Sequence, residues 1–155
     1  MRVAAPFDSQ SFIYRTGEFS YERDPYAGFL VPPEESLAEP LRGYLRNSSL
    51  FREVTEPGSA IAPDILGEIS VTQLYGDFRD RSQPAAVIAM HLTFSRAPPG
   101  APGKVFFEKD YSLRVPLHAR TAPALMAGWN TALTEIVAQV CKDLRAELAR
   151  TAGAP

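Results

Sequence analysis

Cysteine and histidine are scarce in this sequence of 155 residues. Cys141 is the single cysteine, and the only histidines are His91 and His118. One cysteine excludes an intrachain disulfide and a cysteine-based metal site. Two histidines far apart in the chain also leave zinc without a recognisable set of ligands. We therefore expect neither a metal nor another cofactor.

A strong charge of one sign and long apolar runs are lacking as well. The 16 Lys and Arg residues against 18 Asp and Glu give a formal net charge of −2, and the basic residues are scattered, which argues against a nucleic-acid partner. No apolar run approaches the roughly 20 residues that cross a bilayer. No secretory signal is present, yet strand-like residues follow Met1 at once. We expect that a leader was removed and a start methionine added.

The remaining composition is that of an ordinary globular domain, with 45% hydrophobic and 22% charged residues. A chain of this length can bury one sizeable core. We predict a single domain over residues 1–150 and a frayed tail over residues 151–155.

The spacing of apolar residues predicts the secondary structure. Alternation at every second residue predicts strands over residues 2–7, 11–22, 65–75, 85–95 and 104–115, with turns at Thr16-Gly17 and over residues 97–103. Spacing of three to four residues predicts helices over 35–47 and from about Thr121 to residue 148. Pro40 predicts a kink in the first helix or a start near Glu39. Residues 24–35 are predicted to form a loop.

These elements predict an α+β fold. The first helix connects two extended regions, and the following strands form a meander. We expect a mixed, mostly antiparallel sheet of about five strands with two main helices packed on one face.

The sequence contains no complete catalytic constellation. The nucleophile pattern G-x-S-x-G and the dinucleotide pattern G-x-G-x-x-G are absent. The turn GAPGK fails as a phosphate loop because Pro98 and Val105 replace its glycine and its Ser or Thr. We expect His91 to find hydrogen-bond partners at a sheet surface, and Cys141 to pack beside the apolar stripe of the second helix. We also expect Trp129 to fill the core, where the small residue Gly128 lets the helix approach the sheet.

The stretch TQLYGDFRD, residues 72–80, places Asp77 between a glycine and an aromatic residue. No partner in the sequence makes Asp77 an acid or a base, and aspartate commonly ends a strand by bonding its own turn. Two alternatives stay open: a small hydrolase using Asp77 with His91 or His118, and a soluble ligand-sensing domain.

Several segments together resemble a known family. They are FIYRTGEFSYERDPYAGFLVPP, LRNSSLFREV, LYGDF, VFFEKDYSLRVPL and TAPALMAGWNTALTEIVAQVCKDL. Their most specific features are Tyr14-Arg15, Leu50-Phe51, the run from Tyr75 to Phe78, and Trp129-Asn130. Over residues 2–148 the chain resembles the ABC-type transport auxiliary lipoproteins, the paraquat-inducible C-type proteins.

This resemblance implies a non-catalytic periplasmic module. Members are held, usually at the outer membrane, by a lipidated N-terminal cysteine. They act beside an ABC transporter and a protein with mammalian-cell-entry (MCE) domains, in systems that move lipids across the envelope. This sequence departs from the family in having no lipobox and no cysteine before Cys141, and in Pro40 within the first helix.

Two segments, residues 24–31 and residues 75–78, carry more apolar side chains than a solvated surface needs. Loops run over the surface, and exposed aromatic patches there mark interaction sites. We predict that five residues contribute to contacts with a second copy or with the MCE partner: Tyr26, Phe29, Leu30, Tyr75 and Phe78.

Overall fold

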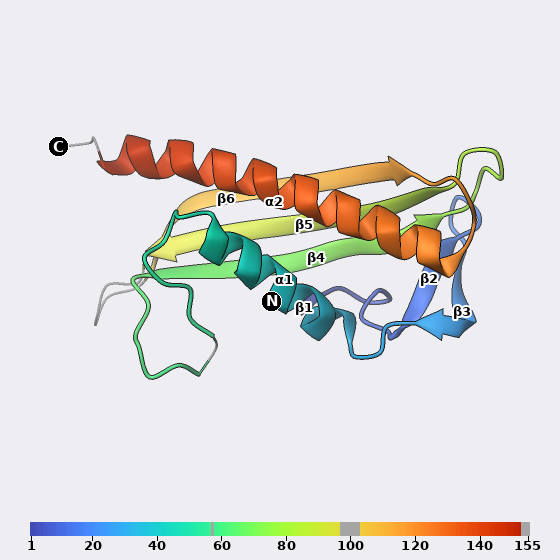
Figure 1. Ribbon diagram of the computed structural model, residues 1–155, viewed down its shortest axis with the longest axis horizontal. Coiled ribbons are helices and arrows are strands. Elements are labelled where there is room, and N and C mark those ends of the chain that lie inside the picture. The colour runs from blue at the N-terminus through green and yellow to red at the C-terminus, as the bar shows by residue number, and fades with distance from the viewer. Residues whose placement is uncertain (57, 97–102, 153–155) are drawn as a thin grey trace.

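A long mixed sheet carries both helices on one of its faces (Figure 1). The computed structural model describes residues 1–56, 58–96 and 103–152. The strands are β1 (Arg2–Val3), β2 (Ser11–Arg15), β3 (Tyr21–Gly28), β4 (Ile65–Asp77), β5 (Ala85–Arg96) and β6 (Lys104–Pro116). The helices are α1 (Pro33–Asn47) and α2 (Ala122–Ala152).

The sheet is built around β4. Its strand order is β3-β2-β4-β5-β6, and β1 pairs with β4 as well. β1 and β2 run parallel to β4 and follow one another along the same edge, with Val3 opposite Val71 and Tyr14 opposite Gly76. All other pairings are antiparallel. The predicted α+β fold, its mixed sheet and its β4–β5–β6 meander are confirmed.

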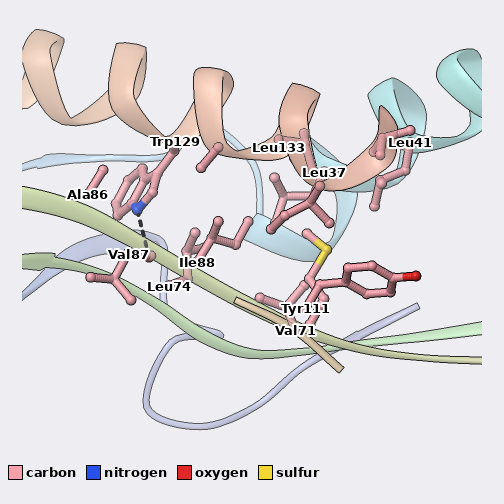
Figure 2. Packing of buried hydrophobic residues seen from close by; sticks show 14 of the residues in the cluster. Leu37, Leu41, Val71, Leu74, Ala86, Val87, Ile88, Tyr111, Trp129 and Leu133 are labelled. Atoms are coloured by element: carbon pink, nitrogen blue, oxygen red, sulfur yellow. Dashed lines mark hydrogen bonds between the residues drawn. The ribbon is translucent and has the colours of Figure 1, made fainter. Parts of the chain in front are cut away.

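The core lies between the sheet and the two helices. Every second residue of β5 is buried beneath them: Ala86, Ile88, Met90, Leu92 and Phe94. Figure 2 shows Leu37 of α1 and Leu133 of α2 on the same side of the sheet as Ile88, whereas Val87 points to the opposite face. A bulge between Val71 and Gln73 shifts the alternation of β4 by one residue. Without that shift, Leu74 would leave the core.

The first helix begins earlier than predicted. It starts at Pro33, two residues before the predicted range of 35–47, and not at the alternative start near Glu39. Proline is well suited to the first helical position, where no N–H is required, and Glu34 and Glu35 favour the positive end of the helix dipole. Pro40 lies within the helix on its exposed side. The hydrogen bond that this proline omits is therefore lost next to solvent.

Three boundaries near the termini and in the predicted loop need correction. The first strand is confined to β1, after which the chain turns and the Phe7 N–H donates to Ala4 O at 2.8 Å. The predicted loop over residues 24–35 is wrong: residues 24–28 belong to β3 and residues 33–35 to α1. The second helix continues through Ala152, beyond its predicted end at residue 148. The predicted turn at 97–103, except Gly103, and the last three tail residues lie outside the described residues.

The predicted close approach of α2 to the sheet is confirmed. A Cβ on Gly128 would lie 2.7 Å from Ala86 Cβ and 2.6 Å from Leu117 Cδ2. Trp129 is buried beside this contact, and its Nε1–H donates to Val87 O at 3.1 Å (Figure 2).

Cys141 packs half-buried against the core, as expected. No helix in the described part of the chain has the length and apolarity to cross a membrane.

The two helical glycines provide a matched test of this contact. A Cβ on Gly43 in α1 would have no atom within 4 Å, unlike a Cβ on Gly128. Gly43→Ala should raise the free energy of unfolding by about 1 kcal/mol through helix propensity. Gly128→Ala should lower it by about 1 kcal/mol, because overpacking costs about 1–3 kcal/mol and outweighs that gain. Urea titration measures both, and equal stabilisation by the two variants would contradict the close approach.

Candidate interaction surface

The connection from β2 to α1 exposes an unusual share of the large apolar side chains. Among the residues that the structure describes, ten large hydrophobic residues are exposed, and half of them fall within residues 19–31, which we call the edge segment. They are Phe19, Tyr21, Tyr26, Leu30 and Val31. Phe19, Tyr26 and Leu30 are 89%, 97% and 96% exposed. Because single exposed hydrophobics are normal but clusters mark binding sites, this segment is the candidate surface.

The backbone that carries Tyr26 is held by Asp24. One carboxylate oxygen of Asp24 accepts the N–H groups of Tyr26 and Ala27 at 2.8 and 3.0 Å, and the other accepts the Tyr14 hydroxyl at 2.6 Å. The Tyr14 hydrogen bond, followed by the Tyr26 N–H, lowers the pKa of Asp24. Burial, reinforced by the bond to Asp24, raises the pKa of Tyr14 well above its ordinary value. Tyr26 thus projects from an ordered turn.

The same hydrogen bonds close part of the β3 edge to strand pairing. Pro25 has no N–H, and the N–H groups of Tyr26 and Ala27 are already used within the chain. An added strand needs free backbone groups along the edge. At residues 25–27 no backbone N–H is therefore left to pair with an added strand.

Leu30 is exposed because its neighbour Phe29 is anchored inside. The Phe29 ring stacks on Trp129 at 5.6 Å between centroids and meets Phe12 edge-on at 5.0 Å. The Phe29 N–H donates to Gln10 O at 2.7 Å, and Gln10 Nε2 donates to Leu30 O at 3.1 Å. Leu30 consequently has an ordered backbone and a free side chain.

The structure separates the five predicted contact residues by exposure. Tyr26 and Leu30 are exposed, and Phe29 is half-buried. Tyr75 and Phe78 are only 5% and 7% exposed, so their side chains mainly supply packing. Tyr75 lies in an aromatic cluster with Phe7 and Tyr21 on the face of the sheet away from the helices.

Phe78 lies on the helix side of the sheet. Its ring stacks on Tyr14 at 4.7 Å, and the Arg120 guanidinium lies 4.7 Å from its centroid. Tyr14, Asp24, Phe78, Arg120 and Ala122 line an open recess of about 380 Å³. Sequence reasoning missed two residues that the geometry makes prominent, Phe19 and Arg120. An aromatic residue in the short segment TGEFS was the available signal for Phe19.

Asp77 is buried and pairs with two arginines. Its carboxylate accepts Arg79 Nε and Nη2 at 2.9 and 2.8 Å, and Arg114 Nε lies 3.6 Å away. It also accepts the Arg79 backbone N–H at 3.4 Å, in keeping with the predicted turn role. The side-chain hydrogen bond from Arg79 is the main cause that lowers the pKa of Asp77 to about 2.

Neither histidine partners Asp77 within the described residues. His91 Nδ1 lies 2.8 Å from Asp110 on the neighbouring strand, and Nε2 lies 3.2 Å from Glu108. The expectation that His91 is satisfied at a sheet surface is confirmed. His118 lies exposed in the loop before α2. The geometry does not assemble the groups that the hydrolase alternative would use.

Two solved structures share this fold. A crystal structure of protein XCC0632 from Xanthomonas campestris, of the family DUF330, is similar with a TM-score of 0.83 and 17% identity, covering 99% of this chain and 84% of that one. A crystal structure of an uncharacterized protein is similar with a TM-score of 0.77 and 13% identity, covering 92% and 86%. No family model and no curated protein matches this sequence. At these identities the likeness shows the fold.

The arginine pairing of Asp77 makes stability depend on pH in the acid range. Because the folded pKa lies near 2, below the ordinary 3.8, ionised Asp77 stabilises the fold above about pH 4, and this is lost as the pH falls towards 2. Asp77→Asn should lower the free energy of unfolding by about 1–2 kcal/mol at pH 7, with the difference vanishing near pH 2. Urea titrations at both pH values measure this.

Asp8 provides the control for this experiment because it is exposed. Asp8→Asn should change the free energy of unfolding by less than about 0.5 kcal/mol at pH 7. A loss for Asp77→Asn that is the same at pH 7 and pH 2 would show that shape, not charge, is what the arginines recognise.

Proposed function

We propose that this chain is a non-catalytic auxiliary component of an ABC/MCE-type lipid transport system, acting as a binding or assembly module. The observation that carries the proposal is the edge segment, where three side chains about nine-tenths exposed stand on a hydrogen-bonded backbone. Aromatic side chains are among the groups from which interfaces derive most of their energy.

The sequence resemblance and the fold support the same family. The resemblance covers residues 2–148 and indicates the paraquat-inducible C-type auxiliary lipoproteins. The family DUF330, to which the similar Xanthomonas campestris protein belongs, is of this type. In this proposal the partners are the MCE-domain protein and the ABC transporter of the same system.

The proposed location is the periplasm, at the outer membrane. The resemblance implies a lipidated N-terminal cysteine as the attachment. One acyl chain binds a membrane only marginally, whereas several chains hold a protein stably. A triacylated cysteine would therefore keep the domain at the membrane without a spanning helix.

Shallow recesses favour a binding module over a lipid carrier. Two recesses among the described residues measure about 380 Å³ each and open widely to solvent. The sheet face beneath the helices is instead filled by buried side chains such as Ile88 and Leu125. A carrier would need an enclosed apolar cavity for acyl chains. In this proposal the domain contacts proteins that move lipid.

Two substitutions test the edge segment against the MCE-domain protein of the same system. Tyr26→Ser and Leu30→Ser should each raise the dissociation constant about tenfold or more, as truncated interface hot spots do. Their free energies of unfolding should stay within about 0.5 kcal/mol of the parent, because both side chains are exposed. Binding is measured by calorimetry with the purified periplasmic domain of the partner.

Ile61→Ser is the matched control, since Ile61 is 54% exposed and lies outside the edge segment. It should leave affinity unchanged. No measurable binding by the parent protein, or equal losses for all three variants, would refute the assignment of this surface.

A further inference from the structure

The two outer strands of the sheet, β3 and β6, differ in how their backbones are used (Figure 1). In β3, the N–H groups of Tyr26 and Ala27 are bonded within the chain, next to a proline that has none. In β6, the register against β5 runs without a shift from Phe107 to Pro116. A long, regular edge strand presents a row of backbone groups that can pair with another strand.

A hydrogen bond at the end of β6 shows which of its backbone groups point outward. The Leu117 N–H donates to Pro84 O at 2.8 Å, in line with the register that places Ala85 opposite Pro116. Bonded and non-bonded residue pairs alternate along an antiparallel ladder. From Phe107 onward, the odd-numbered residues of β6 therefore bond to β5, and the even-numbered ones direct their N–H and C=O away from the sheet. These outward residues are Glu108, Asp110, Ser112 and Arg114.

The outward residues of β6 are open to a partner. All four are exposed. Over residues 1–56, 58–96 and 103–152, no backbone or side-chain group of the chain bonds to their outward N–H or C=O. The backbone of β6 can therefore take up a strand from outside the chain, which is the mode of recognition called β-augmentation.

Two carboxylates on the face away from the helices define the charge of the strand that fits. Side chains of Glu108 and Asp110 are 60% and 85% exposed there, and they lie 3.2 and 2.8 Å from the two ring nitrogens of His91. One imidazole carries at most one positive charge, so it cannot neutralise both carboxylates. Residues directly opposite each other on neighbouring strands share a face. Basic side chains opposite Glu108 and Asp110 would complete this row.

The helix side of β6 defines the other face of the added strand. Tyr111 is buried there, and its hydroxyl donates to Asp143 of α2 at 2.7 Å. Leu113 and Val115 follow on the same side and are only half-buried against the core. Apolar side chains on an added strand would cover the exposed part of these two residues.

We propose that β6 binds an extended segment of another protein as a further strand of the sheet. The segment runs antiparallel to β6, with apolar residues toward α2 and basic residues opposite Glu108 and Asp110. A second copy of this chain fits less well. It brings only Arg114 on that face of its β6, and Arg114 already lies 3.6 Å from Asp77.

This site goes beyond the proposed function, because it lies at the other edge of the sheet from the edge segment and uses backbone pairing. Its charges also give it selectivity. Charged side chains keep an edge strand from pairing indiscriminately, and like charges directly opposite each other are destabilising. An acidic strand is therefore rejected where a basic one is accepted.

Amide hydrogen exchange followed by NMR tests whether the edge is open in the purified chain. The N–H groups of the outward residues should exchange at least about tenfold faster than those of Lys109, Tyr111 and Leu113, which bond to β5. Equal protection of the two sets overturns the proposal. Protection of the outward set that rises with protein concentration assigns the edge to a second copy, and overturns it as well.

A synthetic peptide tests the backbone pairing. The probe is acetyl-Thr-Val-Thr-Val-Lys-Thr-Lys-Val-amide, whose first residue lies opposite Arg114 and whose lysines lie opposite Asp110 and Glu108. It should bind with a dissociation constant of about 1 mM or tighter and slow the exchange of the outward N–H groups.

N-methylation of the probe separates backbone pairing from other contacts without altering the protein. Methylating both lysine nitrogens removes two N–H groups that face β6, and should raise the dissociation constant at least about tenfold. Methylating the second valine and the third threonine, whose N–H groups point away from β6, is the matched control and should change it less than about threefold. Equal losses for the two peptides overturn the proposal.

Charge reversal tests the selectivity. With glutamate in place of both lysines, the peptide should bind the parent at least about tenfold more weakly. The double variant Glu108→Arg with Asp110→Arg should prefer this acidic peptide. Glu68→Arg, an exposed residue of β4 outside the edge strand, is the control and should keep the parental preference.

The outcomes also distinguish this site from the proposed function. A parent protein that binds neither peptide, or both equally, overturns the proposal. Tyr26→Ser and Leu30→Ser should leave peptide binding unchanged, since both residues belong to the edge segment. Peptide binding is measured without the MCE-domain protein, so either proposal can fail while the other holds.

Discussion

The close approach of α2 to β5 is the constraint on which the rest of the structure depends. Gly128 lets the helix backbone lie against Ala86, and this proximity allows the indole of Trp129 to reach the Val87 carbonyl (Figure 2). The same indole packs edge-on against Phe12 and face-on against Phe29. One side chain therefore joins the second helix to the central sheet, to β2 and to the segment that leads into α1.

This arrangement explains how a small domain keeps apolar side chains in solvent without losing order around them. Phe29 is held inside by Trp129, and its neighbour Leu30 is consequently displayed. Tyr26 is displayed by the three hydrogen bonds that Asp24 accepts. When the backbone is already ordered, binding does not also have to pay for ordering it. The exposed groups of the edge segment thus have the physical properties of contact residues.

The sequence predicted the long periodic elements well and the short ones poorly. The strand near Ile88 and the helix near Trp129 each bury one continuous stripe, so their periodicity indicates their structure directly. The later part of β3 was missed because Pro25 and Gly28 are typical of loops, and its pairing with β2 is decided by tertiary contact. Gly28 is needed there, since a Cβ would lie 2.4 Å from Gln10 O. Local pattern cannot show such a close approach.

The residues of the candidate surface were predictable only in part, because local sequence does not show which side chains become buried. A pattern shows that aromatics are near a strand end, but burial depends on which face each one takes, and Tyr75 and Phe78 take opposite faces of the sheet. The role of a charged side chain likewise depends on its neighbours in space. Asp77 neutralises Arg79, so that cation is not free for a partner, whereas the Arg120 guanidinium lies over the Phe78 ring and, among the described residues, has no carboxylate partner. Composition counts these arginines alike, and only their neighbours in space distinguish a structural charge from one that can bind.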